Sequence, residues 1–312
     1  MIPVIDFAGP TAQVAASIRT ACETSGFFYL ANHGVSDAVI GATVAQARLF
    51  FRQPIEAKRK VAMNARHRGF NALGDALMYE ARKPDHKEFF SIGLELPEDD
   101  PDVLAGEKLR GPNNWPAEMP DFRAALSAYY EALGGCGAKL MRAVAVSLDL
   151  PSAFFVDKYQ KRLQRTQIIY YPPHPPAAEA DQFGLAPHTD FGCITLLWQD
   201  DSGGLEVLER SSRRWIAAPP IAGTLVVNVG DLLGRWTNDR YASTPHRVVN
   251  RSGHERFSIA TFYDPDFKAV VDPRALGVAE AECRYPPTLA GEHILGRIDR
   301  SFGYRKALAA AQ

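Results

Sequence analysis

Near its middle the chain reads Leu185-Ala-Pro-His-Thr-Asp-Phe-Gly-Cys-Ile-Thr-Leu-Leu-Trp198. The apolar and β-branched residues of this stretch predict a strand. His188 and Asp190 are two positions apart, and on a strand this spacing points both side chains to the same face. One metal ion could therefore bind both residues.

A second histidine, His246, begins another predicted strand much later in the chain. It can reach the same metal ion only if the sheet folds back on itself, as it does in a jelly roll. Two imidazoles and one carboxylate on one side of a metal form the facial triad of non-haem Fe(II) oxygenases. The remaining metal positions would stay open for a co-substrate and O2.

Residues 165–264 consist of short β-branched or aromatic runs separated by Gly, Pro, Asn and Asp clusters, with no alternation of strands and helices. This pattern predicts a mainly β protein with flanking helices and a double-stranded β-helix core, also called a jelly roll or cupin-like fold. The expected strands are 166–171, 185–198, 205–209, 215–218, 224–229, 246–250 and 256–263.

Helical patterns flank these strands on both sides. Apolar periodicity predicts helices over 11–24, from Ser36 as N-cap to Phe51, over 121–148 and over 288–302. We expect one structural unit with three parts: a mainly helical region over 1–160, the catalytic jelly roll over 161–270, and a helical segment over 271–312.

Arg256 and Ser258 lie two apart on the last predicted strand. The turn signal Asn250-Arg-Ser-Gly253 predicts that this strand and the strand of His246 form an antiparallel hairpin. In that hairpin Arg256 and Ser258 face the same interior as the metal. A buried guanidinium needs an anionic partner, so we expect the pair to bind a carboxylate of a bound acid.

In this order and spacing, His188-x-Asp190, His246 and Arg256-x-Ser258 resemble the Fe(II) and 2-oxoglutarate dependent dioxygenases of the isopenicillin N synthase-like superfamily. Further similar stretches are Gly26-Phe-Phe-Tyr-Leu-Ala-Asn-His-Gly-Val35, Pro84-Asp-His-Lys-Glu88, Tyr170-Tyr-Pro-Pro173 and Arg256-Phe-Ser-Ile-Ala-Thr-Phe-Tyr263, so the resemblance covers nearly the whole chain.

The resemblance implies that His188, Asp190 and His246 hold Fe(II) and are the catalytic centre. It also implies that Arg256 and Ser258, helped by Tyr171, bind the distal carboxylate of 2-oxoglutarate. With O2 as the other co-substrate, such an enzyme oxidises a small metabolite and releases succinate and CO2. Hydroxylation is the usual outcome, and desaturation and ring formation are alternatives.

Two other functions remain open at this point. One is a keto-acid-independent Fe(II) oxidase, similar to isopenicillin N synthase or aminocyclopropane carboxylate oxidase, in which Arg256 and Ser258 hold a carboxylate of the main substrate. The other is a non-catalytic, metal-dependent sensor of a small acid.

Some polar segments are given structural or undecided roles. Asp85, Lys87 and Glu88 could form a charged lip at the active-site mouth, but the interpretation as a solvated run that stabilises a helix or turn is favoured. The stretch Asn228-Val-Gly-Asp231 is interpreted as a turn between strands. Arg66, Arg68, Phe70 and Tyr79 could contact an anionic or aromatic substrate, or could belong to a solvated surface.

Composition narrows the class of protein. The chain has 312 residues, of which 46% are hydrophobic and 23% charged, with a formal net charge of −1. This composition is typical of a globular protein, and the net charge provides no overall field to attract nucleic acid or an anionic membrane.

The four cysteines are far apart and no apolar run could span a bilayer. We therefore expect a cytoplasmic enzyme with a small-molecule substrate and no nucleic-acid or membrane partner. Its oligomeric state is not predicted.

Overall fold

The computed structural model describes residues 1–75, 83–174, 182–302 and 305. Its helices are α1 (Thr11–Thr24), α2 (Asp37–Phe51), α3 (Ile55–Arg59), α4 (Pro101–Leu104), α5 (Pro120–Ser147), α6 (Asp231–Trp236) and α7 (Ala290–Ser301), with short 3-10 turns η1 (Val156–Tyr159), η2 (Pro273–Leu276) and η3 (Glu280–Glu282). Its strands are β1 (Val4–Asp6), β2 (Phe27–Ala31), β3 (Gly69–Asn71), β4 (Glu88–Gly93), β5 (Arg165–Tyr171), β6 (Leu185–His188), β7 (Ile194–Gln199), β8 (Leu205–Leu208), β9 (Trp215–Ala217), β10 (Thr224–Val229), β11 (His246–Val248), β12 (Arg256–Tyr263), β13 (Val270–Val271) and β14 (Thr288–Leu289).

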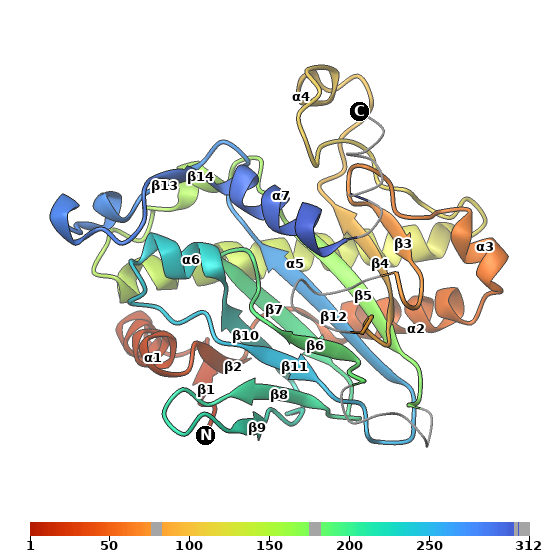
Figure 1. Cartoon of the computed structure of the whole chain (residues 1–312), viewed down its shortest axis with the longest axis horizontal. Coiled ribbons are helices and arrows are strands. Elements are labelled where there is room, and N and C mark those ends of the chain that lie inside the picture. The colour runs from red at the N-terminus through yellow and green to blue at the C-terminus, as the bar shows by residue number, and fades with distance from the viewer. Residues whose placement is uncertain (76–82, 175–181, 303–304, 306–312) are drawn as a thin grey trace.

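Two sheets form the core. The larger has eight strands in the order β1-β2-β10-β7-β12-β5-β4-β3, and the smaller has four in the order β6-β11-β8-β9 (Figure 1). All pairings in them are antiparallel except that of β1 with β2. Residues from both sheets line one pocket. This arrangement is the predicted jelly roll, and strands from the first half of the chain extend its larger sheet.

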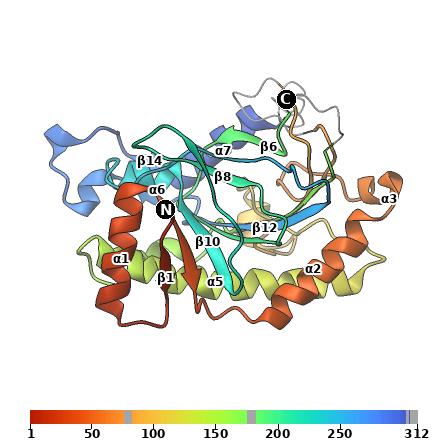
Figure 2. The ribbon, with the colours of Figure 1, turned by 90° about the horizontal axis from the view of Figure 1, so that it is seen from below.

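The helices α1, α2 and α5 cover the outer face of the larger sheet (Figure 1, Figure 2). Alternation along β12 separates the two faces of this sheet: Phe257 and Ile259 point to the helices, whereas Arg256 and Ser258 line the pocket. The aromatic rings of Phe50, Phe90 and Phe122 pack against one another beneath the helices. The pocket thus has a rigid, fully packed wall behind it.

Most predicted elements are present with end points shifted by a few residues. The helix over 11–24 has the expected bounds, and Ser36 caps α2 by accepting a hydrogen bond from the Val39 N–H. The predicted strand over 185–198 is in fact two strands, β6 and β7, which belong to different sheets. The predicted helix over 288–302 begins only after the short strand β14.

The predicted hairpin between the strands of His246 and Arg256 is wrong. β11 pairs with β6 and β8 in the smaller sheet, whereas β12 pairs with β5 and β7 in the larger sheet. The turn signal at 250–253 is real, but the turn carries the chain from one sheet to the other. Both strands still direct alternate side chains into the shared pocket, so the expectation that His246 and Arg256 face one interior is confirmed.

Within the described ranges, no helix combines the length and the apolar character that a membrane crossing requires.

Candidate active site

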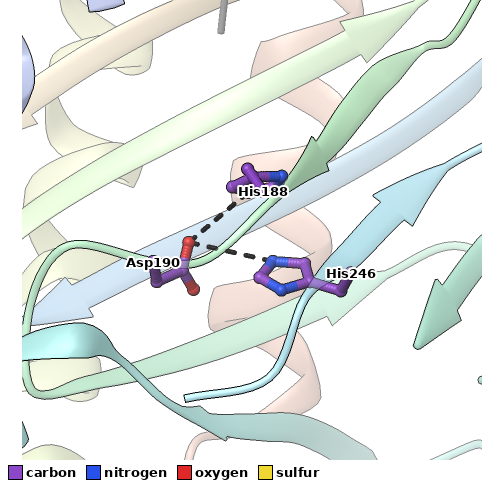
Figure 3. A group of neighbouring side chains, drawn as sticks. All are labelled: His188, Asp190 and His246. Atoms are coloured by element: carbon purple, nitrogen blue, oxygen red, sulfur yellow. Dashed lines mark ion pairs between the residues drawn. The ribbon is translucent and has the colours of Figure 1, made fainter. Parts of the chain in front are cut away.

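His188, Asp190 and His246 lie together (Figure 3), and all three line the pocket. His188 ends β6 and His246 begins β11, and the two residues are direct partners across the smaller sheet. Asp190 follows in the loop between β6 and β7. One nitrogen or oxygen atom from each of the three residues lies within 4.8 Å of the others, so the group could hold a metal ion.

The carboxylate of Asp190 is held by two neutral donors. The Thr195 hydroxyl and the Asn228 side-chain amide donate to Oδ2, at 2.6 Å and 2.7 Å. The other oxygen, Oδ1, lies 3.6 Å from Nε2 of His188 and 3.8 Å from Nε2 of His246. One carboxylate oxygen is therefore used for positioning, and the other remains directed at the imidazoles.

The imidazoles are oriented by backbone carbonyls. Nδ1 of His188 lies 2.9 Å from the Ala186 oxygen, and Nδ1 of His246 lies 3.3 Å from the Thr244 oxygen. Because a carbonyl oxygen can only accept, these contacts favour the proton on Nδ1 of each ring. Nε2 of each ring then has a free lone pair toward Asp190, as metal binding requires.

The charge states of these groups also suit a metal cation. Burial, with His188 alongside, lowers the pKa of His246 to about 4, so its imidazole is neutral near pH 7. Burial opposes ionisation of Asp190, but the two histidines and Asn228 outweigh it and its pKa lies well below the usual value. An ionised carboxylate and a neutral imidazole are ligand types that divalent iron takes in facial-triad sites.

The loop that carries Asp190 is tied to the start of α6. The Thr189 hydroxyl donates to the Asp231 carboxylate at 3.1 Å, and the Asp231 N–H donates to the Asp190 carbonyl at 2.7 Å. A Cβ atom on Gly230 would lie 2.3 Å from the Gly192 oxygen, so only glycine permits this close approach. The prediction of a turn between strands at 228–231 is wrong: Asn228 and Val229 end β10, Gly230 follows, and Asp231 begins α6. This junction supports the loop that carries Asp190, a role that the sequence did not indicate.

Arg256, Ser258 and Tyr171 line the same pocket. Arg256 is fully buried, and it donates from Nε to the Gly203 oxygen at 2.6 Å and from Nη2 to Gln199 at 3.1 Å. Its Nη1 and the Ser258 hydroxyl are buried without a hydrogen-bond partner among the residues that the structure describes. The Tyr171 ring lies beneath the guanidinium, with its centroid 4.8 Å from Cζ.

Two buried donors without partners call for an explanation. Arg256 has no acidic partner among the described residues. A ligand carboxylate would satisfy Nη1 of Arg256 and the Ser258 hydroxyl together. The pocket therefore fits a cofactor that has a carboxylate to bind Arg256 and Ser258 and other atoms to bind a metal held by His188, Asp190 and His246.

Several further pocket residues were missed or misinterpreted from the sequence. Asp85 and Lys87 are buried, with exposed fractions of 2% and 6%, so the interpretation as a solvated run is wrong. Lys87 lines the pocket and forms an ion pair with Asp85. Asn228 was interpreted only as part of a turn, and Thr195 gave no sequence signal, because both lie among apolar residues of their strands.

The proposed substrate contacts near the pocket mouth are not supported. Arg66 pairs with Glu98 on the surface, Arg68 donates to the Leu109 oxygen, and Phe70 packs against Phe50. These three side chains are not part of the pocket lining. Tyr79 lies outside the described residues.

Comparison with known proteins agrees with this geometry. Residues 2–118 match the family described as the non-haem dioxygenase in morphine synthesis N-terminal region, and residues 163–265 match the 2OG-Fe(II) oxygenase superfamily. The 2-oxoglutarate-Fe(II) type oxidoreductase hxnY of Emericella nidulans is 33% identical over 98% of this chain and 93% of its own length. The chain belongs to the 2OG-Fe(II) oxygenase superfamily.

Solved structures support the same assignment for this oxygenase. A full-length Neurospora crassa protein, solved in complex with α-ketoglutarate, superposes with a TM-score of 0.84 at 30% identity, covering 95% of both chains. A 2OG-Fe(II) oxygenase family protein from Caulobacter crescentus gives a TM-score of 0.83 at 33% identity, covering 95% of this chain and 98% of its own.

The oxygenase is thus an oxidoreductase that uses Fe(II) and 2-oxoglutarate to oxidise a small metabolite. This confirms the resemblance and the reaction class expected from the sequence. Of the three functions that the sequence left open, the 2-oxoglutarate dependent dioxygenase is the one that the relatives support.

Proposed function

We propose that His188, Asp190 and His246 hold the Fe(II) of this dioxygenase. The support is their grouping, the orientation of both Nε2 atoms toward Oδ1 of Asp190, and the ionised state of that carboxylate. The supporting contacts from Thr195 and Asn228 keep the donor set in place before metal arrives.

In the same pocket, Arg256 and Ser258 bind the distal carboxylate of 2-oxoglutarate. The observation that carries this assignment is the pair of buried donors, Nη1 of Arg256 and the Ser258 hydroxyl, for which the described residues provide no hydrogen-bond partner. Tyr171 supports the guanidinium from below through its ring face. A planar guanidinium matches a carboxylate in two parallel hydrogen bonds, which lysine cannot reproduce.

When bound, Fe(II) and 2-oxoglutarate supply an oxidative decarboxylation that consumes O2, releases succinate and CO2, and oxidises a nearby C–H bond of the substrate. The residues of the chain orient these groups and exclude water from between them. Apolar side chains of Leu185, Leu197 and Phe262 also line the pocket. We expect hydroxylation as the usual outcome.

The main substrate is a small molecule that enters the same pocket. Related structures contain such molecules: the Neurospora crassa protein was also solved with thymine, and JOX2 with JA. We also propose a reducing, cytoplasmic location, which the four free cysteines of the structure support.

Two measurements test this proposal. The wild-type enzyme with Fe(II), ascorbate and 2-oxoglutarate is screened against small metabolites, and succinate should rise in step with loss of one of them. Alanine at His188, Asp190 or His246 should abolish both succinate release and iron binding. His254→Ala is the control, because His254 is exposed and outside the pocket. Equal iron contents in the three variants and the wild type would contradict the assignment.

A further inference from the structure

Lys87 is a buried cation inside the active-site pocket. Its side chain is 7% exposed, and its Nζ lies 3.2 Å from the fully buried carboxylate of Asp85. Asp85 is itself fixed, because its Oδ1 accepts the Ala186 N–H at 2.9 Å on the strand that carries His188. The ion pair is therefore attached to the metal-binding strand and its charge is already balanced.

Arg165 repeats this arrangement at the start of β5. It also lines the pocket, and its Nη2 lies 3.1 Å from the Asp264 carboxylate, with both side chains buried. Asp264 is held in turn by the Cys193 N–H, which donates to Oδ1 at 2.7 Å. Within the described part of the chain, the Nε–H of Arg165 has no hydrogen-bond partner.

When Fe(II) and 2-oxoglutarate are bound, the charges of the pocket balance without any charge from the main substrate. Among the described residues of the pocket lining, the lysine and arginine side chains are Lys87, Arg165 and Arg256, and the carboxylate is Asp190. Lys87 and Arg165 have their own carboxylates. Fe(II) is balanced by Asp190 and one carboxylate of 2-oxoglutarate, and Arg256 is balanced by the other. An additional anion would find no counter-charge among these described lining residues, which is costly in a buried site.

On the basis of the proposed function, we propose that the main substrate is a neutral molecule with hydrogen-bond acceptors, and that the Lys87–Asp85 pair selects against anionic substrates. Lys87 keeps ammonium N–H groups beyond the one facing Asp85, and Arg165 keeps its Nε–H. Carbonyl oxygens or ring nitrogens of a neutral substrate can accept from these donors. Apolar neighbours such as Phe191 and Phe262 suit the rest of such a molecule.

The test compares neutral and anionic probes of one shape. Benzamide with benzoate, and nicotinamide with nicotinate, are titrated by calorimetry into the enzyme loaded with Fe(II) and 2-oxoglutarate under anaerobic conditions. In the wild type we expect each carboxamide to bind at least tenfold more tightly than its carboxylate. Loading with Fe(II) and 2-oxoglutarate is measured first without a probe, so that a failure of the proposed function is seen separately.

Asp85→Asn gives the decisive variant, because it leaves the Lys87 charge unbalanced. We expect its affinity for benzoate and nicotinate to rise at least tenfold over the wild type. The double variant Asp85→Asn, Lys87→Met removes both charges and should lose this gain. Asp201→Asn makes the same chemical change at an exposed residue outside the pocket and should leave both affinities unchanged.

Two results would overturn the proposal. The first is a wild-type enzyme that binds the carboxylates more tightly than the carboxamides. The second is an Asp85→Asn enzyme that is folded, as judged by its thermal unfolding, and gains no affinity for either carboxylate. If the wild type binds neither the carboxamides nor the carboxylates, the proposal is judged by Asp85→Asn alone. Measurable binding of a carboxylate by this variant supports the proposal, and its absence overturns it.

Discussion

At the scale of single residues, the two oxygens of Asp190 have different tasks. Oδ2 accepts from Thr195 and Asn228, while Oδ1 is left for the metal-binding side. Asn228→Ala should therefore keep all three proposed ligands yet lower Fe(II) affinity about 10–100-fold, which is typical of lost supporting contacts. Competition with a coloured chelator measures this affinity. An unchanged affinity would show that Thr195 alone is sufficient to position the carboxylate.

Arg256 and Ser258 should affect 2-oxoglutarate rather than the main substrate. Losing one partner of a buried charged pair costs about 3–5 kcal/mol, so Arg256→Ala should raise the KM for 2-oxoglutarate by about a hundredfold or more. Ser258→Ala removes one hydrogen bond to a charged group, which is worth about 1.5–3 kcal/mol.

Steady-state kinetics with each substrate varied in turn separate the two effects. Arg256→Lys should not restore the wild-type value, because an ammonium cannot form the paired hydrogen bonds. The assignment fails if Arg256→Ala changes the KM of the main substrate but leaves that of 2-oxoglutarate unaltered. Arg256 and Ser258 would then hold a carboxylate of the main substrate, as expected for a keto-acid-independent oxidase.

At the scale of elements, the packing of α5 on the larger sheet supports the back of the pocket. Gly137 faces the sheet, and a Cβ atom there would lie 2.5 Å from the Tyr263 ring. That ring is buried and stacked on Tyr159 with a centroid distance of 5.0 Å, so it cannot move aside easily. Gly135 lies on the same helix but is exposed, and a Cβ atom there would meet nothing within 4 Å.

The two glycines therefore make a matched pair for a stability measurement. Gly137→Ala should lower the free energy of unfolding by about 1–3 kcal/mol through overpacking. Gly135→Ala should raise it by about 0.5–1 kcal/mol, because alanine loses less backbone entropy in a helix. Urea unfolding followed by circular dichroism measures both values. Equal effects of the two substitutions would contradict the packing of α5 described above.

At the scale of the whole molecule, the thiols report on folding and on redox state. Cys22, Cys136 and Cys193 are buried, and Cys283 is partly exposed. Burial raises the pKa of Cys136 to about 12 and the pKa of Cys22 and Cys193 as well, so their reactive thiolates are suppressed. In the folded protein only Cys283 should react quickly with a thiol reagent.

Unfolding without a reductant should release the other three thiols. The expected count is thus one fast thiol in the native protein and four in urea, as all four cysteines are free in the structure. Absorbance with a chromogenic disulfide reagent measures both counts. Fewer than four thiols in protein purified anaerobically would indicate a disulfide and would argue against the proposed cytoplasmic location.

Local pattern was sufficient to predict much of this protein. Alternation predicts which side chains share a strand face, and it correctly placed Arg256 with Ser258 on β12. His188 and Asp190 also lie together as predicted, but Asp190 lies in the loop after β6, so strand alternation is not the reason. Capping and apolar periodicity predicted α1 and α2 with nearly correct bounds. These features depend on neighbours within a few residues, and for this reason they can be deduced from sequence alone.

Tertiary structure alone decided the sheet partners and the burial of charge. The turn at 250–253 is compatible with a hairpin or with a change of sheet, and only the long-range pairing of β11 and β12 with other strands selects the second. Likewise, the local sequence around Asp85 and Lys87 is typical of a solvated segment, but both residues are buried. Asp85 accepts a hydrogen bond from Ala186 of β6 and pairs with Lys87. Whether a polar residue is buried depends on contacts distant in sequence, which no local pattern records.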